Sequence, residues 1–107
     1  MTILTHVLKS DAYEQILTEI RYSVATARAN EKELISIKFN TDNNDSSKVL
    51  PAIIRALKKI KKEGRIDFFV SAEDFLSGNA ETSYLLNRFP DIIGKLEDEK
   101  SNFIVKV

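Results

Sequence analysis

Acidic and hydroxyl side chains follow two stretches of the sequence that are typical of β-strands, and they come closest to forming a chemical site. Ser10 and Asp11 follow the stretch ILTHVL, while Ser71, Glu73 and Asp74 follow RIDFFV. Carboxylates at the carboxyl ends of neighbouring parallel strands suit a divalent cation or a phosphate group. Asp11, Glu73 and Asp74 are therefore the metal candidates. Helix capping by the serines and helix-dipole interactions of the acids explain the same residues more simply.

The residues needed for several other kinds of catalytic site are missing. His6 is the single histidine and the chain has no cysteine, which excludes a multi-histidine metal site and a thiolate nucleophile. The three glycines stand singly, so there is no glycine-rich phosphate loop. His6 lies within a predicted strand, where a hydrogen-bonded structural role is a simpler interpretation than that of a catalytic base. We therefore favour a non-enzymatic protein without a cofactor over an enzyme.

A basic stripe follows one face of a helix predicted over residues 46–63. Its members are Lys48, Arg55, Lys58, Lys59 and Lys62. Such a stripe could follow the phosphate backbone of a nucleic acid. Solvated helix faces show the same pattern, and 16 basic residues balance 16 acidic ones over the chain, so no net field attracts nucleic acid or an anionic membrane. Nucleic-acid binding is the second functional hypothesis.

Residues 79–93 carry more large apolar side chains than short helical segments readily bury against one small sheet. Exposed apolar surface of this kind marks protein interfaces. The sequence therefore predicts a protein-binding or regulatory domain that self-associates as a homo-oligomer through this segment. The predicted contact residues are Tyr84, Leu85, Phe89, Ile92 and Ile93. Burial of the same side chains in the core is the competing interpretation.

The elements that must position these side chains alternate between strand and helix. Strands are predicted over 3–8, 33–39, 65–70 and 101–107, and long helices over 12–29 and 46–63. Ser10 or Asp11 is expected to cap the first helix, and Ser46 or Ser47 the second. The polar segment 41–47 is expected to be a loop. The last crossover is predicted to be broken by Gly78 and Pro90, with a capping box formed by Ser71 and Asp74.

This alternation predicts one α/β domain over residues 1–107 with a four-stranded, mostly parallel sheet. The segment around Phe68 is the most continuously apolar and is expected to be innermost, while Lys38 and Lys106 indicate edge strands. The resulting strand order is 2-1-3-4, a flavodoxin-like arrangement in miniature. The alternative is a two-layer α/β sandwich with all helices on one face.

Membrane insertion and secretion are not expected. No apolar run approaches the roughly 20 residues that span a bilayer, and the N-terminal residues lack the features of a secretory signal. The absence of cysteine fits a reducing compartment. The sequence thus predicts a cytoplasmic protein.

Overall fold

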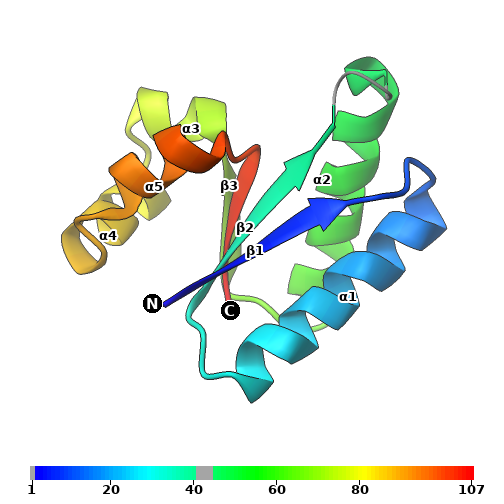
Figure 1. The fold of residues 1–107 in the computed structure, drawn as a ribbon, viewed down its shortest axis with the longest axis horizontal. Helices are drawn as coiled ribbons and strands as arrows, with labels where there is room; N and C mark the ends of the chain where they lie inside the picture. Colours follow the sequence, from blue (N-terminus) through cyan, green and yellow to red (C-terminus); the bar gives the residue numbers. More distant parts are fainter. Residues whose placement is uncertain (1, 41–44) are drawn as a thin grey trace.

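A computed structural model of the protein describes residues 2–40 and 45–107, and its core is one sheet with helices on both faces. Figure 1 shows α1 and α2 on one side of the sheet and the three shorter helices on the other. The elements are β1 (Ile3–Leu8), α1 (Tyr13–Ala29), β2 (Leu34–Phe39), α2 (Ser46–Lys62), β3 (Phe68–Ser71), α3 (Ala72–Ser77), α4 (Ala80–Arg88), α5 (Ile92–Glu99) and β4 (Phe103–Lys106). The two-layer alternative is therefore wrong. The predicted loop 41–47 lies mostly outside the described residues.

The described part of the chain forms a four-stranded mixed sheet, and both the predicted order and the predicted parallel pairing are wrong. The order is β1-β2-β4-β3. β1 and β2 are parallel, whereas β4 runs antiparallel to both of its neighbours. β3, which carries Phe68, therefore lies at a margin. β2 and β4, which carry Lys38 and Lys106, are the two central strands.

The last crossover explains the antiparallel strand. It leaves the sheet at Ser71 and returns at Phe103, and these two residues pair directly. The Ala72 N–H also donates to the Asn102 carbonyl at 3.0 Å. The crossover therefore begins where β3 ends and finishes beside that point, where β4 begins. A strand that starts where its predecessor ends must run in the opposite direction. The breaks at Gly78 and Pro90 divide the crossover into short helices, none of which runs the length of the sheet as the 17-residue helices α1 and α2 do.

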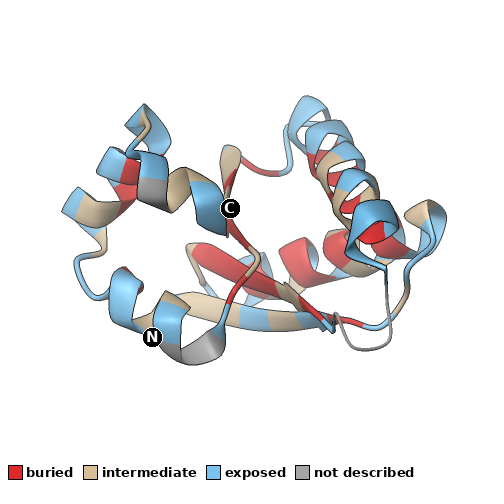
Figure 2. Cartoon of the chain, turned by 90° about the horizontal axis from the view of Figure 1, so that it is seen from above, coloured by how far each residue is buried: buried red, intermediate tan, exposed pale blue. Residues whose placement is uncertain are grey.

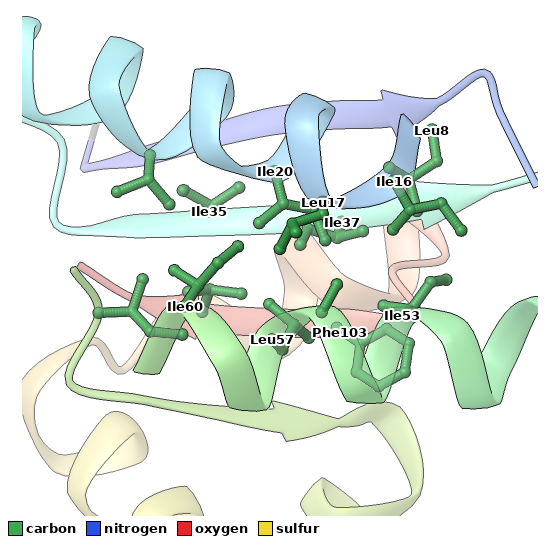
Figure 3. Packing of buried hydrophobic residues seen from close by; sticks show 14 of the residues in the cluster. Leu8, Ile16, Leu17, Ile20, Ile35, Ile37, Ile53, Leu57, Ile60 and Phe103 are labelled. Carbon is green, nitrogen blue, oxygen red and sulfur yellow. The ribbon is translucent and has the colours of Figure 1, made fainter. Parts of the chain in front are cut away.

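The main core lies between the sheet and the helices α1 and α2. The apolar stripes of the two helices meet the side of the sheet that carries Ile35, Ile37 and Phe103 (Figure 3). Ile16 and Ile20 from α1, with Ile53, Leu57 and Ile60 from α2, are completely buried there. Each such side chain contributes roughly 1.5–3 kcal/mol on burial. This layer fixes the register of β1 and β2.

A smaller core lies on the opposite face, under the short helices. Its buried members are Leu34, Val70, Leu85, Ile92 and Ile104. Figure 2 shows that α3, α4 and α5 are largely exposed on their outer sides, whereas α1 and α2 carry a continuous row of buried positions. This second layer covers one end of the sheet face and leaves Val7 of β1 50% exposed.

Helix ends follow the predicted breakers more closely than the predicted caps of the long helices. Ser71 and Asp74 form the predicted capping box, and Gly78 ends α3 with φ of 71°. The caps predicted for α1 are wrong, because the N-cap is Ala12 and no side chain bonds there. The α2 cap is also one residue earlier than predicted: Asp45 accepts the Ser47 N–H at 3.0 Å.

Candidate protein-binding surface

An apolar groove of about 400 Å³ opens between α3 and α5 beside α4. Phe75 of α3, Leu86 of α4, and Ile93 and Leu96 of α5 line its floor and walls. The capping box and the left-handed Gly78 fix the direction of α3, while Pro90 ends α4 and lets α5 begin at an angle to it. The groove therefore results from the two breakers in the crossover.

Charged and polar groups stand at one end of this groove. Glu97 and Lys100 line it together with Ser101, and Lys100 adopts the left-handed conformation with φ of 53°. The Ser101 hydroxyl is buried and hydrogen-bonds the Ser36 hydroxyl of the central strand β2. The groove is thus apolar along its length and polar where the chain enters β4.

The structure separates the five predicted contact residues into two groups. Leu85 is fully buried and Ile92 is only 4% exposed, so both belong to the second core. Phe89 is half-buried against the same core. Tyr84 and Ile93 are 46% and 47% exposed. The apolar surface left uncovered by this segment is therefore carried by Tyr84 and Ile93.

Tyr84 is held in place by an aromatic contact. Its ring meets Phe68 of β3 edge-on, with the centroids 5.9 Å apart. This geometry suits the ring quadrupoles and leaves the other side of Tyr84 exposed to solvent. Tyr84 is therefore a partly exposed aromatic group that packs against β3.

A second, smaller cavity of about 250 Å³ lies where the turn between α4 and α5 approaches the start of β1. Ile3, Leu34 and Phe89 give it an apolar base. Arg88 lies at its rim, where it bonds Glu33 at 3.2 Å. This ion pair connects α4 to the residue before β2 and supports the position of the short helices.

The predicted basic stripe is exposed along α2. Lys48, Arg55, Lys58, Lys59 and Lys62 are all exposed. Arg55 lies over the ring of Tyr13 in α1, 4.1 Å from its centroid. The four lysines form no salt bridge with any other residue that the structure describes. Lys59 interacts electrostatically with Glu63, so Lys48, Lys58 and Lys62 carry the charges most available to an anionic partner.

The three metal candidates are not brought together. Asp11 follows β1 and Glu73 and Asp74 follow β3, and these strands are the two margins of the sheet, roughly 14 Å apart at three strand spacings. The expected site required β1 and β3 to be neighbours, and that arrangement is wrong. Asp74 is engaged by the backbone N–H of Ser71 at 3.0 Å. No group of three or more His, Cys, Asp or Glu side chains capable of holding a metal ion occurs within residues 2–40 and 45–107.

Two polar features were missed by the sequence analysis. Glu19 accepts hydrogen bonds from the backbone N–H groups of Lys9 and Ser10, each at 3.1 Å, and lies 3.3 Å from His6 Nε2. It thereby secures the loop after β1. The buried pair of Ser36 and Ser101 joins β2 to the end of the crossover. Ser36 on a strand whose neighbouring positions are apolar was the available signal.

No known protein-family model, curated protein or solved structure matches this chain. Among the described helices, none is both long enough and apolar enough to cross a membrane.

Proposed function

We propose that this protein is a non-enzymatic protein-binding domain and that the groove between α3 and α5 receives apolar side chains of a different protein. The exposure of Ile93 on the wall of that groove is the observation that carries the proposal. A half-exposed isoleucine beside Phe75, Leu86 and Leu96 gives a continuous apolar surface in a concave site. Burying such a surface against a partner is the main source of binding free energy in protein interfaces.

The shape of the surface favours a different protein over a second copy at this position. A twofold dimer requires each patch to fit itself. A groove is filled instead by a projecting group, such as one apolar face of a helix laid between two helices. Tyr84 offers an additional exposed aromatic contact, a residue type enriched at binding hot spots. Self-association through residues 79–93 stays a prediction and is one outcome of the test below.

Site-specific photo-cross-linking tests the proposal. Benzoylphenylalanine is introduced at Ile93 in the full chain, expressed in cells of the natural source, and irradiated. The matched control carries the same group at Ser83, which is exposed on α4 and does not line the groove. We expect one discrete protein adduct at position 93 and none at position 83. Equal labelling at both positions, or no adduct at 93, contradicts the proposal.

A second variant establishes that binding depends on the apolar wall. Ile93→Glu should remove the adduct formed by a second photo-reactive group placed at Glu97, whereas Ser83→Glu adds the same charge on α4 and should not affect it. The identity of the adduct separates the two forms of the hypothesis. A different protein supports the groove proposal, and a second copy of this chain supports the self-association prediction instead.

The exposed stripe on α2 supports nucleic-acid binding as a second candidate function. The observation in its favour is that Lys48, Lys58 and Lys62 form no salt bridge in the described part of the chain. A stripe with free charges releases counterions on binding, so affinity should fall by about 0.9 log units per contacted phosphate for each log unit of salt.

Titration with fluorescently labelled duplex DNA and single-stranded RNA at two salt concentrations tests this candidate. Lys58→Glu/Lys62→Glu should abolish binding. The control Lys9→Glu/Lys100→Glu makes the same change in net charge at exposed residues away from α2 and should retain it. Absence of wild-type binding at low salt, or equal losses in the two double variants, refutes the candidate.

A further inference from the structure

The margin of the sheet formed by β1 is an unprotected edge strand. β1 is six residues long, pairs with β2 in a regular parallel register, and contains neither a charged residue nor a proline. Natural proteins usually shorten, charge or bulge such edges because their free backbone groups template pairing with another chain. The opposite margin, β3, has only four residues. β1 is thus the edge that can accept another strand.

The backbone bonds to β2 identify the groups that β1 leaves unused. The Thr2 carbonyl accepts the Leu34 N–H at 3.0 Å, and Ile3 is the register partner of Leu34. Neighbouring residues of a strand direct their backbone groups to opposite sides, so even-numbered residues of β1 face β2. Ile3 and Val7 therefore direct their N–H and C=O groups away from the sheet, and no described residue bonds them there.

Exposed apolar side chains flank the same edge on both faces. Val7 is 50% exposed on the face of the short helices. Tyr22 of α1 is 72% exposed, the largest exposure among the exposed large hydrophobic residues. Glu19 of α1 contacts His6 of β1. Tyr22 comes three positions after Glu19 and therefore lies next to Glu19 on the helix surface. Nine residues separate Tyr22 from Tyr13, which faces α2, so Tyr22 lies on the side of α1 remote from α2.

We propose that β1 pairs antiparallel with β1 of a second copy of this chain, around a twofold axis at Thr5. In this register Ile3 lies opposite the partner's Val7 and Val7 lies opposite the partner's Ile3. These two pairs exchange about four backbone hydrogen bonds, using the outward groups that the monomer leaves unpaired. The two sheets become one sheet of eight strands with both α1 helices on the same face.

The side chains fit this register. Val7 gains a β-branched neighbour on its exposed face, and Thr5 faces its own copy, both favourable cross-strand pairs. Along the axis of α1, Tyr22 lies about 4.5 Å from Glu19, the residue that contacts His6. This distance equals the length of between one and two strand residues, so Tyr22 lies level with a point on β1 that is displaced from His6 toward Thr5. The two Tyr22 side chains therefore approach the same twofold axis.

A second copy suits this edge better than an unrelated strand. Antiparallel pairing about an axis is isologous, so one uncharged strand satisfies both sides of the interface. The strand brings no like charges together, and the formal net charge of zero gives no repulsion between whole molecules. This dimer uses β1 and α1, and is independent of the groove between α3 and α5 in the proposed function.

Charge complementation at Thr5 tests both the partner and the register. Thr5 is exposed, and its substitution leaves the main core untouched. Sedimentation velocity should show a dimer for the wild type. Thr5→Lys alone and Thr5→Glu alone should each weaken the dimer by about a hundredfold, because like charges meet at the axis. An equal mixture of the two variants should form a heterodimer. A variant that merely failed to fold would not be rescued by mixing.

Proline at the outward-facing position provides an independent test. Val7→Pro removes an N–H that points away from β2, a position at which an edge strand tolerates proline. The Val7→Pro variant should be folded by circular dichroism and monomeric by sedimentation velocity. The control Val7→Thr keeps the N–H and should remain dimeric. Ile93→Glu should leave the dimer unchanged, which separates this inference from the groove proposal. A wild-type monomer up to about 1 mM, or a dimer that Thr5→Lys and Val7→Pro leave intact, overturns the inference.

Discussion

Leu85→Ala measures whether α4 belongs to the core or to an interface, and the structure predicts a large loss of stability. Leu85 is fully buried in the second core against Val70 and Ile104 of the sheet. Truncating a buried leucine costs about 2–5 kcal/mol, because transfer free energy is lost and a cavity remains. The total stability of a domain is about 5–15 kcal/mol, so this one change removes a substantial part of it.

The assay is equilibrium unfolding in urea, followed by circular dichroism, with thermal unfolding alongside. Each kcal/mol should lower the Tm by about 4–8 °C for a domain of this size. Ile93→Ala is the matched control on the same layer: its side chain is 47% exposed, and its truncation should cost about 1 kcal/mol or less. If Leu85→Ala costs no more than Ile93→Ala, the packing of α4 on the sheet is refuted and Leu85 becomes a surface residue.

Further substitutions probe three contacts that hold the elements together. The Arg21 guanidinium bonds the Glu63 carboxylate and lowers the pKa of Glu63 from its ordinary value of 4.5. Ionised Glu63 therefore stabilises the fold fully above pH 4.5, and this contribution is lost as the pH falls through the lowered pKa. The difference in unfolding free energy between wild type and Glu63→Gln should therefore shrink between pH 6 and about pH 2, as urea titrations at several pH values will show; a constant difference would disprove the link. Asp74→Ala removes one half of the α3 capping box and should cost about 0.5–2 kcal/mol, whereas Asp74→Asn should cost less; equal losses would argue against the bond to the Ser71 N–H. For the buried hydroxyl pair, Ser36→Ala and Ser101→Ala should each cost about 1–3 kcal/mol by leaving one group unsatisfied, while the double variant should cost less than the sum; additive losses in a double-mutant cycle would contradict the bond.

The elements could be predicted from local sequence because their causes are local. Apolar residues at helical spacing placed both long helices, whose ends at Ala29 and Lys62 lie at or within a residue of the prediction. Gly78 and Pro90 divided the last crossover as expected, because a left-handed cap and a missing N–H act within one turn. The predicted cap at Ser10 or Asp11 failed because α1 begins at Tyr13, which places Ala12 at the N-cap position.

The strand order could not be predicted, because the apolar character of a strand indicates that it is buried but not which strands lie next to it. Phe68 and Val70 are apolar since α3, α4 and α5 cover β3 at the margin of the sheet. Lys106 lies on a central strand and is nevertheless tolerated: its ammonium group reaches Asp67 on the neighbouring margin at 3.7 Å. A lysine on a central strand can extend its charged end to the periphery of the sheet, and in the sequence it cannot be distinguished from a lysine on an edge strand.

Whether residues 79–93 form a contact surface stays a prediction, and only Leu86 and Ile93 of the groove lie within that segment. Residues 79–93 do include two half-exposed apolar side chains, Tyr84 and Ile93. Which members of the segment face the sheet depends on where α4 docks on β3, and this is set by long-range contacts such as the ring pair of Phe68 and Tyr84. Helical periodicity within a nine-residue helix does not contain that information.

The position of β4 connects the error in strand order to the proposed dimer. In the predicted order β1 would have been an inner strand, and its uncharged, β-branched sequence would have needed no further explanation. In the structure β4 takes the place beside β2, and β1 becomes a margin. The strand keeps the composition of a buried element, while the outward backbone groups of Ile3 and Val7 have no described partner and Val7 is 50% exposed. A second copy of β1 supplies what the inner position would have supplied: a neighbouring strand in register and an apolar partner for Val7.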